Sequence, residues 1–446
     1  MKRRDFSRAT IVLTAASLAA LIVAPMAGSA AGLSSSPFAV KAVNIAEAKH
    51  FAIRPFFDGK TVPTPTPEPT TPPVTTPSPT APPTVEPTVP PTPEPELIKS
   101  KTVSMTINTA MANCQAPFSL EVFSTSNASS TNAVINWGDE ATTGVAPATL
   151  KSGVNNHTYP KAGTYQLEIQ GTLEGFTRST TMGTSNPNNC IESVTHFGEK
   201  TGITTLDGMF KGARNLKSVS APPSTLQSTR YMFQDAWSFN GDITDWNMAN
   251  VTTMEGMFKD ARGFNQPIGK WNTESLTESI YMFQNAWAFN QPLNSWKMGK
   301  VTNASWMFYN ARAFNQNLTN WDMGMNANFS LMFAQAPSFN GDVSTWDTAR
   351  SANMYAMFRG ATAFNQDLDR WKTGNSLSFS EMFSGATAFN GKVGTWDVTK
   401  SINVGSMFLD AKAFNQNLNS WDIGNKTKAS FATGSALTPE NRPKGY

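Results

Sequence analysis

The chain has 446 residues, which is room for two or three domains. Charged residues make up only 15% of it and the net charge is +3, so it lacks the clustered basic face that a nucleic-acid-binding protein needs. The mean hydropathy of −0.31 fits a soluble domain.

The N-terminus has the pattern of an export signal. Four basic residues within the first eight precede an apolar run over residues 9–24, and small residues follow. This predicts a signal peptide over residues 1–31. The pair Arg3-Arg4 fits a twin-arginine signal as well as an ordinary basic start. We expect cleavage, whereas an uncleaved segment would anchor the chain in a membrane.

Residues 32–97 are predicted to be disordered. Within them, residues 63–95 hold 15 of the 29 prolines together with many threonines. Such a composition cannot form a packed core and favours an extended polyproline II stalk.

Residues 98–190 show strand and turn patterns of a separate β-domain. Residues 134–139 read Val-Ile-Asn-Trp-Gly-Asp, residues 157–159 read His-Thr-Tyr, and residues 163–165 read Gly-Thr-Tyr. These motifs resemble those of PKD-type immunoglobulin-like domains, which implies an all-β sandwich. Asp139 is open to interpretation as a metal ligand or an acid, but the resemblance implies a turn residue.

Two cysteines, Cys114 and Cys190, are the only ones in the chain. An even number in an exported protein predicts one disulfide, which would clamp the two ends of the β-domain.

A 25-residue repeat dominates the rest of the chain, residues 191–446. A Met-Phe pair, a Trp, an Ala and a Phe-Asn pair each return at this interval. The Met-Phe pairs are Met232-Phe233, Met257-Phe258, Met282-Phe283, Met307-Phe308, Met332-Phe333, Met357-Phe358, Met382-Phe383 and Met407-Phe408. The tryptophans are Trp246, Trp271, Trp296, Trp321, Trp346, Trp371, Trp396 and Trp421. A fixed period of this size predicts a solenoid in which equivalent residues of successive coils stack, with degenerate caps at both ends.

Spacing within one unit predicts the structure of a coil. Ile243, Trp246 and Met248 have the strand spacing of a leucine-rich repeat, and the stretch from Met254 to Ala261 has its apolar residues at 0, 3, 4 and 7, the face of a short helix. The Asn that follows each recurring Phe, from Asn240 to Asn415, is expected to hold a tight, left-handed turn.

The repeats resemble the BspA-family leucine-rich-repeat surface proteins of bacteria, a group once labelled a domain of unknown function. The unit beginning at Met357-Phe358 carries this resemblance well. The fold expected is therefore an α/β repeat, an LRR-like solenoid with a short strand and a short helix per coil, behind the β-sandwich. The resemblance implies an exported surface protein that acts as an adhesin, and it brings no catalytic residues.

A search for chemistry finds no catalytic motif, metal-ligand spacing or phosphate-binding loop. The column after each Trp alternates acidic, amide and lysine side chains, which indicates a solvated face. We expect no enzyme activity, no cofactor and no metal.

Extra aromatic and arginine side chains occur in the first four regular coils, where the core set is already complete. They are Tyr231, Trp237, Arg262, Tyr281, Trp287, Trp306, Tyr309 and Arg312. Stacking predicts a cation–π ladder of alternating Trp and Arg from Trp237 to Arg312. These residues either form a ligand-binding patch or shield the coil edges and dock the preceding domain.

The sequence as a whole predicts a bacterial surface-exposed or secreted protein that recognises an extracellular protein through its solenoid. Two alternatives remain: a carbohydrate-binding surface protein, and a structural spacer of the cell envelope without a ligand. No nucleic-acid partner is expected, contact with the membrane would involve only an uncleaved N-terminal segment, and the sequence leaves the oligomeric state open.

Overall fold

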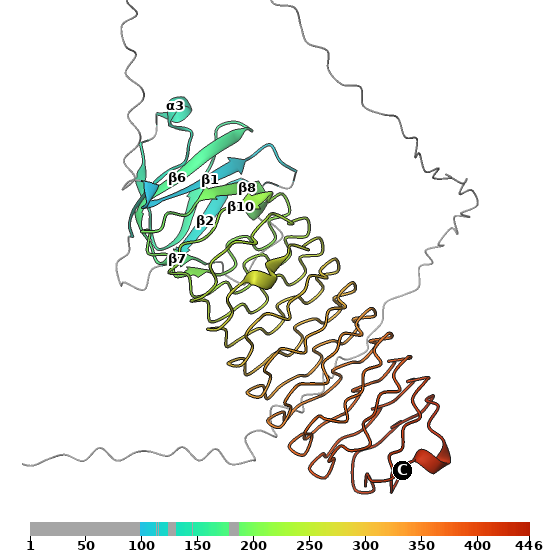
Figure 1. The fold of residues 1–446 in the computed structure, drawn as a ribbon. Helices are drawn as coiled ribbons and strands as arrows, with labels where there is room; N and C mark the ends of the chain where they lie inside the picture. Colours follow the sequence, from blue (N-terminus) through green and yellow to red (C-terminus); the bar gives the residue numbers. More distant parts are fainter. Residues whose placement is uncertain (1–98, 113, 115, 124–130, 145, 178–186) are drawn as a thin grey trace, which may run out of the picture. The chain divides into compact units, whose positions relative to one another are not determined.

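The structure is a computed structural model that describes residues 99–112, 114, 116–123, 131–144, 146–177 and 187–446 (Figure 1). The predicted signal peptide and the Pro/Thr-rich stalk lie outside the described residues. No helix in the described ranges is long and apolar enough to span a membrane. The regular elements are β1 (Thr102–Asn108), β2 (Phe118–Phe123), β3 (Asn132–Asn136), α3 (Glu140–Thr143), β4 (Ala148–Thr149), β5 (Gly153–His157), β6 (Thr164–Thr172), β7 (Gly175–Phe176), η1 (Pro187–Cys190), β8 (Ile191–His196), β9 (Thr205–Leu206), β10 (Ser218–Val219), η2 (Ile268–Lys270) and η3 (Pro439–Asn441).

Two mixed sheets make up the β-domain, and both continue into the repeats. Their strand orders are β10-β8-β1-β6-β3-β4 and β5-β2-β7-β9. In the first sheet β1 pairs antiparallel with β6, from Thr102 opposite Gln170 to Asn108 opposite Thr164. Strand β8 starts at the predicted boundary of the repeats, yet it pairs with β1 on one side and runs parallel to β10 on the other. The β-domain is thus hydrogen-bonded directly to the first coil.

The second sheet leads into a parallel ladder that runs along the solenoid. β7 pairs with β9 in parallel, and the ladder then takes one residue from each coil in turn. These residues are Thr205, Ser228, Thr253, Glu278, Asn303, Asn328, Asn353, Ser378, Asn403 and Thr427. Figure 1 shows the coils side by side in sequence order, from green to red.

The predicted α/β coil is wrong. α3, a four-residue helix of the β-domain, is the one α-helix in the described part of the chain; the described coils contain no α-helix, and η2 in one of them is a three-residue 3₁₀-helix. The stretch predicted as a strand, Ile243 to Met248, forms a turn, with the Trp246 N–H donating to Ile243 O over 3.3 Å. The regular coils therefore consist mainly of turns with one bridge residue each, and η2 adds a single 3₁₀ turn to one of them.

Left-handed residues explain why the segment around each Met-Phe pair is not helical. The residue before each pair and the residue two places after it have positive φ, as at Tyr231 (φ 53°) and Asp235 (φ 59°). A right-handed helix cannot continue through such residues. Because left-handed residues interrupt the right-handed ones in this segment, every second backbone N–H points toward the next coil. The Phe258 N–H, for example, donates to Met282 O, one coil further on, over 2.9 Å. The remaining N–H groups close turns within the coil, as from Met257 to Met254 O.

Stacked aromatic rings fill the centre of the solenoid, as the period predicts. Trp246 and Trp271 lie 6.4 Å apart with their planes 8° from parallel, and Phe233 and Phe258 lie 5.6 Å apart. From Trp271 to Trp396, each indole N–H also donates to a backbone carbonyl 28 residues earlier, as in the 3.0 Å bond from Trp271 to Ile243 O. Packing and hydrogen bonds thus fix the register of the coils together.

The Asn column connects coils instead of holding left-handed turns. Asn240 and its equivalents are not among the residues with positive φ. The Asn240 side-chain oxygen accepts the backbone N–H of Asn265 over 2.9 Å, and the same bond recurs up to Asn415. Gln266 adds a bond to Asn240 O over 2.7 Å.

Candidate interaction face of the solenoid

All eight predicted site residues lie in or directly after the segments around the Met-Phe pairs, at residues 231–237 and the equivalent positions of the next three coils. In the segment around each Met-Phe pair, two side chains that point into the core are followed by two that point outward. Met232 and Phe233 are buried, whereas Gln234 and Asp235 after them are partly exposed. The predicted residues occupy outward positions of this pattern in four successive coils.

The ladder expected from the spacing is present, and it is longer than predicted. The Arg262 guanidinium lies 4.4 Å from the centre of the Trp237 ring and 4.3 Å from that of Trp287. Arg312 covers Trp287 at 3.9 Å, and Arg214 covers Trp237 at 3.7 Å. We call these five residues the arginine–tryptophan ladder. Sequence reasoning missed Arg214 because it belongs to the irregular first coil, although it follows Ala213 as the others follow their column of alanines.

The ladder leaves little aromatic surface free. Arg214 comes from the coil before Trp237 and Arg262 from the coil after it, so the two guanidinium groups cover opposite faces of the indole. Trp287 is enclosed in the same way by Arg262 and Arg312. Both indoles are partly buried, whereas Arg214 and Arg312 are exposed. The ladder therefore presents ring edges and guanidinium N–H groups.

A second group of aromatic residues forms an apolar patch on the same segments. Trp306 lies 6.0 Å from Tyr281 and 4.7 Å from Tyr309, with ring planes tilted by 52° and 45°. We call these three residues, with the others they pack against, the aromatic cluster. The others are Leu331, Ala334, Tyr355 and Ala356, which form with Trp306 and Tyr309 a hydrophobic cluster separate from the main core. The sequence analysis missed this second set because its members lie in later coils.

Tyr231, the remaining predicted residue, contacts its own neighbours. Its hydroxyl donates to the Glu255 carboxylate. Its ring occupies the space where a Cβ on Gly256 would lie, only 2.3 Å from a ring carbon. Burial, followed by the bond to Glu255, raises the pKa of Tyr231 above its ordinary value, so the phenol is neutral at physiological pH.

Ion pairs border the aromatic cluster. Glu381 accepts a hydrogen bond from the Tyr355 hydroxyl over 3.2 Å and pairs with Arg359 at 2.9 Å. On the N-terminal side Arg230 pairs with Glu278 and lies 3.6 Å from Glu255. The aromatic rings of the cluster are thus partly exposed among polar groups, whereas Leu331, Ala334 and Ala356 are buried against them.

Asp139 has a structural environment. It is 2% exposed, and its Oδ2 lies 2.9 Å from the His157 Nε2. The His157 ring stacks on Trp137 at 4.7 Å, and the Tyr159 hydroxyl donates to the Trp137 carbonyl over 3.1 Å. The two sequence motifs of the β-domain therefore hold each other in place.

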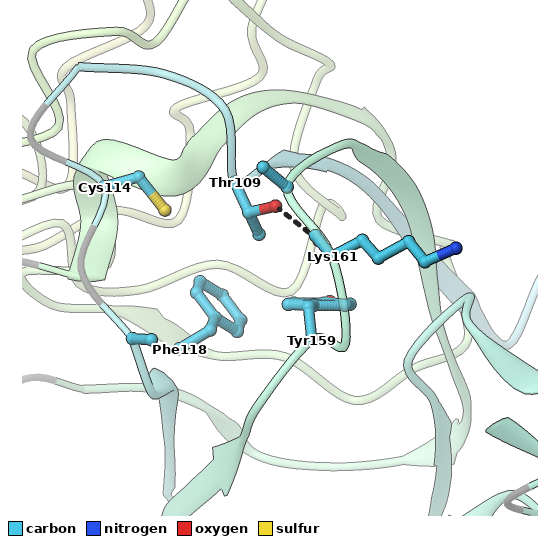
Figure 2. A pocket seen from close by; sticks show the side chains of 7 residues that line it. Thr109, Cys114, Phe118, Tyr159 and Lys161 are labelled. Atoms are coloured by element: carbon cyan, nitrogen blue, oxygen red, sulfur yellow. Dashed lines mark hydrogen bonds between the residues drawn. The ribbon is translucent and has the colours of Figure 1, made fainter. Parts of the chain in front are cut away.

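The predicted disulfide between Cys114 and Cys190 is present. Beside Cys114 lies a cavity of about 170 Å³, lined also by Thr109, Phe118, Tyr159 and Lys161 (Figure 2). Thr109 donates to the Lys161 carbonyl over 3.4 Å. Burial raises the pKa of Tyr159, so Lys161 is the one charged side chain in the lining. This set contains no pair of groups suited to acid–base chemistry.

The acidic column after the tryptophans caps turns. The Asp322 carboxylate accepts the Gly324 N–H over 3.1 Å, and Asp397 accepts that of Thr399 over 2.9 Å. No group of three His, Cys, Asp or Glu side chains suited to a metal ion occurs in the described ranges.

Comparison with known proteins finds one family. No curated protein and no solved structure matches the chain. A family model described as "Mycoplasma protein of unknown function, DUF285" matches it twice, over residues 226–345 and 327–442. The regular coils of the solenoid, residues 226–442, are therefore similar to the DUF285 family.

Proposed function

We propose that this is an exported protein of the bacterial surface or surroundings whose solenoid recognises an extracellular protein. The arginine–tryptophan ladder and the aromatic cluster form the recognition face. The resemblance of the repeats to BspA-type surface proteins supports this proposal, as does the signal-like N-terminus. In this view the β-domain, with its PKD-type motifs, carries the solenoid.

The observation that carries this proposal is that large side chains, two of them aromatic, occupy backbone positions that disfavour them. Tyr281, Trp306 and Leu331 have φ values of 59°, 61° and 58°. A left-handed conformation costs a residue with a Cβ about 1–2 kcal/mol. Ser406 holds the same position in the eighth regular coil with a small side chain, so folding does not require an aromatic there. Residues that oppose local preference without serving the core indicate a role in binding.

Carbohydrate binding is the second candidate, and the ring geometry favours it less. Sugar rings stack on open aromatic faces, but both faces of Trp237 and Trp287 are covered by guanidinium groups. The tilt of 45–52° between neighbouring rings of the aromatic cluster also fails to make a flat platform. A protein ligand with its own side chains fits such an uneven surface better.

The test is binding of the full chain to a panel of extracellular matrix proteins and glycans. The variant W306S/Y309Q replaces two cluster residues with side chains that the same columns carry in other coils, at Ser406 and Gln284. The control S406G/L409Q changes the equivalent positions of the eighth coil. We expect a protein ligand whose binding the first variant loses and the control keeps. Binding to glycans alone, or no binding at all, would contradict the proposal, and no binding would favour the spacer.

A further inference from the structure

The three arginines of the ladder are held in place without acidic partners. No carboxylate of the described residues pairs with Arg214, Arg262 or Arg312. Arg230 and Arg359, on the same face, are each paired with glutamates. Stacking on indoles fixes the planes of the ladder guanidinium groups. The Arg312 Nε–H donates to Asn310 Oδ1 over 3.4 Å and the Arg262 Nε is buried, so an anion would meet the terminal NH₂ groups of these two arginines.

The spacing of these groups is regular. The two ring distances on either side of Trp237 place the Arg214 and Arg262 guanidinium carbons at most about 8 Å apart, and those around Trp287 do the same for Arg262 and Arg312. In an extended peptide, side chains on one face recur about every 6.8 Å. Flexible carboxylate side chains on alternate residues can therefore meet successive guanidinium groups.

The local charge is positive. Five basic side chains face two acidic ones on and beside the ladder. They are Lys211, Arg214, Lys259, Arg262 and Arg312, against Asp235 and Asp260. Asp235 lies beside the ladder, where it interacts with the Trp237 side chain and with Asp260, Lys211 and Lys259, so the basic side chains remain in excess.

We propose that the arginine–tryptophan ladder binds an acidic segment of a protein ligand in extended conformation, with carboxylates on alternate residues. Each guanidinium donates a pair of N–H groups to one carboxylate. This inference rests on the proposed function, since it names the chemistry of a protein ligand on the same face. An acidic glycan is the rival, but the covered indole faces leave no surface on which its sugar rings can stack.

The experiment uses the full chain and a labelled peptide of about twelve residues with alternating Thr and Glu, long enough to span the ladder. Fluorescence anisotropy measures its affinity at low salt, beside a Thr–Gln peptide and a sulfated glycan fragment. The variant R214Q/R312Q removes the two exposed ends of the ladder, and R370Q removes an exposed arginine outside it. Circular dichroism checks that both variants remain folded.

We expect the Thr–Glu peptide to bind, the variant R214Q/R312Q to bind it about tenfold more weakly, and R370Q to bind it as the wild type does. Affinity should fall with added salt. Equal binding of the Thr–Gln peptide, equal binding by R214Q/R312Q, or binding of the sulfated glycan alone would overturn the inference. A matrix protein whose binding depends on Trp306 and Tyr309, but not on the ladder arginines, would leave the proposed function standing while this inference fails.

Discussion

Replacing Gly385 with alanine tests whether the coil is built of turns or contains a helix, because the two structures predict opposite changes in stability. Gly385 is in the left-handed region with φ of 71°, and its N–H donates to Leu409 O in the next coil over 2.7 Å. It would lie inside the helix that the spacing of Phe379, Met382 and Phe383 predicts. In a helix interior, alanine is more favourable than glycine by about 0.8–1.0 kcal/mol.

The observed backbone predicts that the substitution lowers the stability of the protein instead. A new Cβ at Gly385 would meet only Gly360, at 3.7 Å, so no clash contributes. The left-handed conformation costs alanine about 1–2 kcal/mol, and the less flexible unfolded chain returns about 0.4–1 kcal/mol. The net destabilisation is therefore about 1 kcal/mol, a fall of roughly 2 °C in the unfolding midpoint.

Thermal unfolding followed by circular dichroism and tryptophan fluorescence measures this change. Gly163 supplies the control, because its φ is not in the left-handed region and the nearest atom to a new Cβ is 3.7 Å away. We expect G163A to leave the midpoint unchanged or slightly raised. A midpoint raised by G385A would refute the left-handed assignment and restore the helix.

Three further predictions concern stability. The double variant C114S/C190S should unfold more easily by up to about 4 kcal/mol, measured in denaturant, because the disulfide closes a long loop with a sequence separation of 76 residues; an unchanged midpoint would contradict the bond. N365A should cost about 1 kcal/mol, since it removes the acceptor of the Asn390 N–H, whereas N365D keeps an oxygen there and should cost less. Burial and a neighbouring carboxylate raise the pKa of Asp235 above its ordinary 3.8, so its ionised form opposes folding. D235N should therefore raise the unfolding midpoint at pH 7, and the gain should disappear as the pH falls below about 4.

The 25-residue period was the part of the sequence pattern that predicted the structure correctly. Because the Met-Phe, Trp and Asn columns recur at a constant interval, equivalent residues of successive coils must stack, and this holds for any local backbone conformation. That is why the aromatic core and the ladder from Trp237 to Arg312 agree with expectation. The pairing of Cys114 with Cys190 followed equally directly from their number.

The conformation within the coil was mispredicted because a helix and a chain of turns can have the same spacing of apolar residues. Apolar residues at 0, 3, 4 and 7 mark a helix face, but paired inward and outward positions in a segment with left-handed residues give the same pattern. A signal was nevertheless present two places after each Met-Phe pair. That column holds Asp235, Asp260, Asn285, Asn310, Gln335, Gly360, Gly385 and Asp410, and glycine, asparagine and aspartate are the residues that tolerate positive φ.

Continuity between the β-domain and the repeats was also hidden from the sequence. The change of motif near residue 190 suggests a boundary, yet β8 sits inside a sheet of the β-domain and β9 extends the other. Strand pairing between distant segments depends on which edges meet in the folded chain, and neither composition nor period records that.

Segments that do not follow the repeat pair with the first and the last coils of the solenoid. At one end β7 pairs with β9. At the other, the Leu418 N–H donates to Asn441 O, and Asp422 forms a parallel bridge with Lys444. A stack of parallel coils with bare ends is a template on which further copies can add into fibres. The two ends of this stack therefore present different hydrogen-bonding edges, which do not match each other.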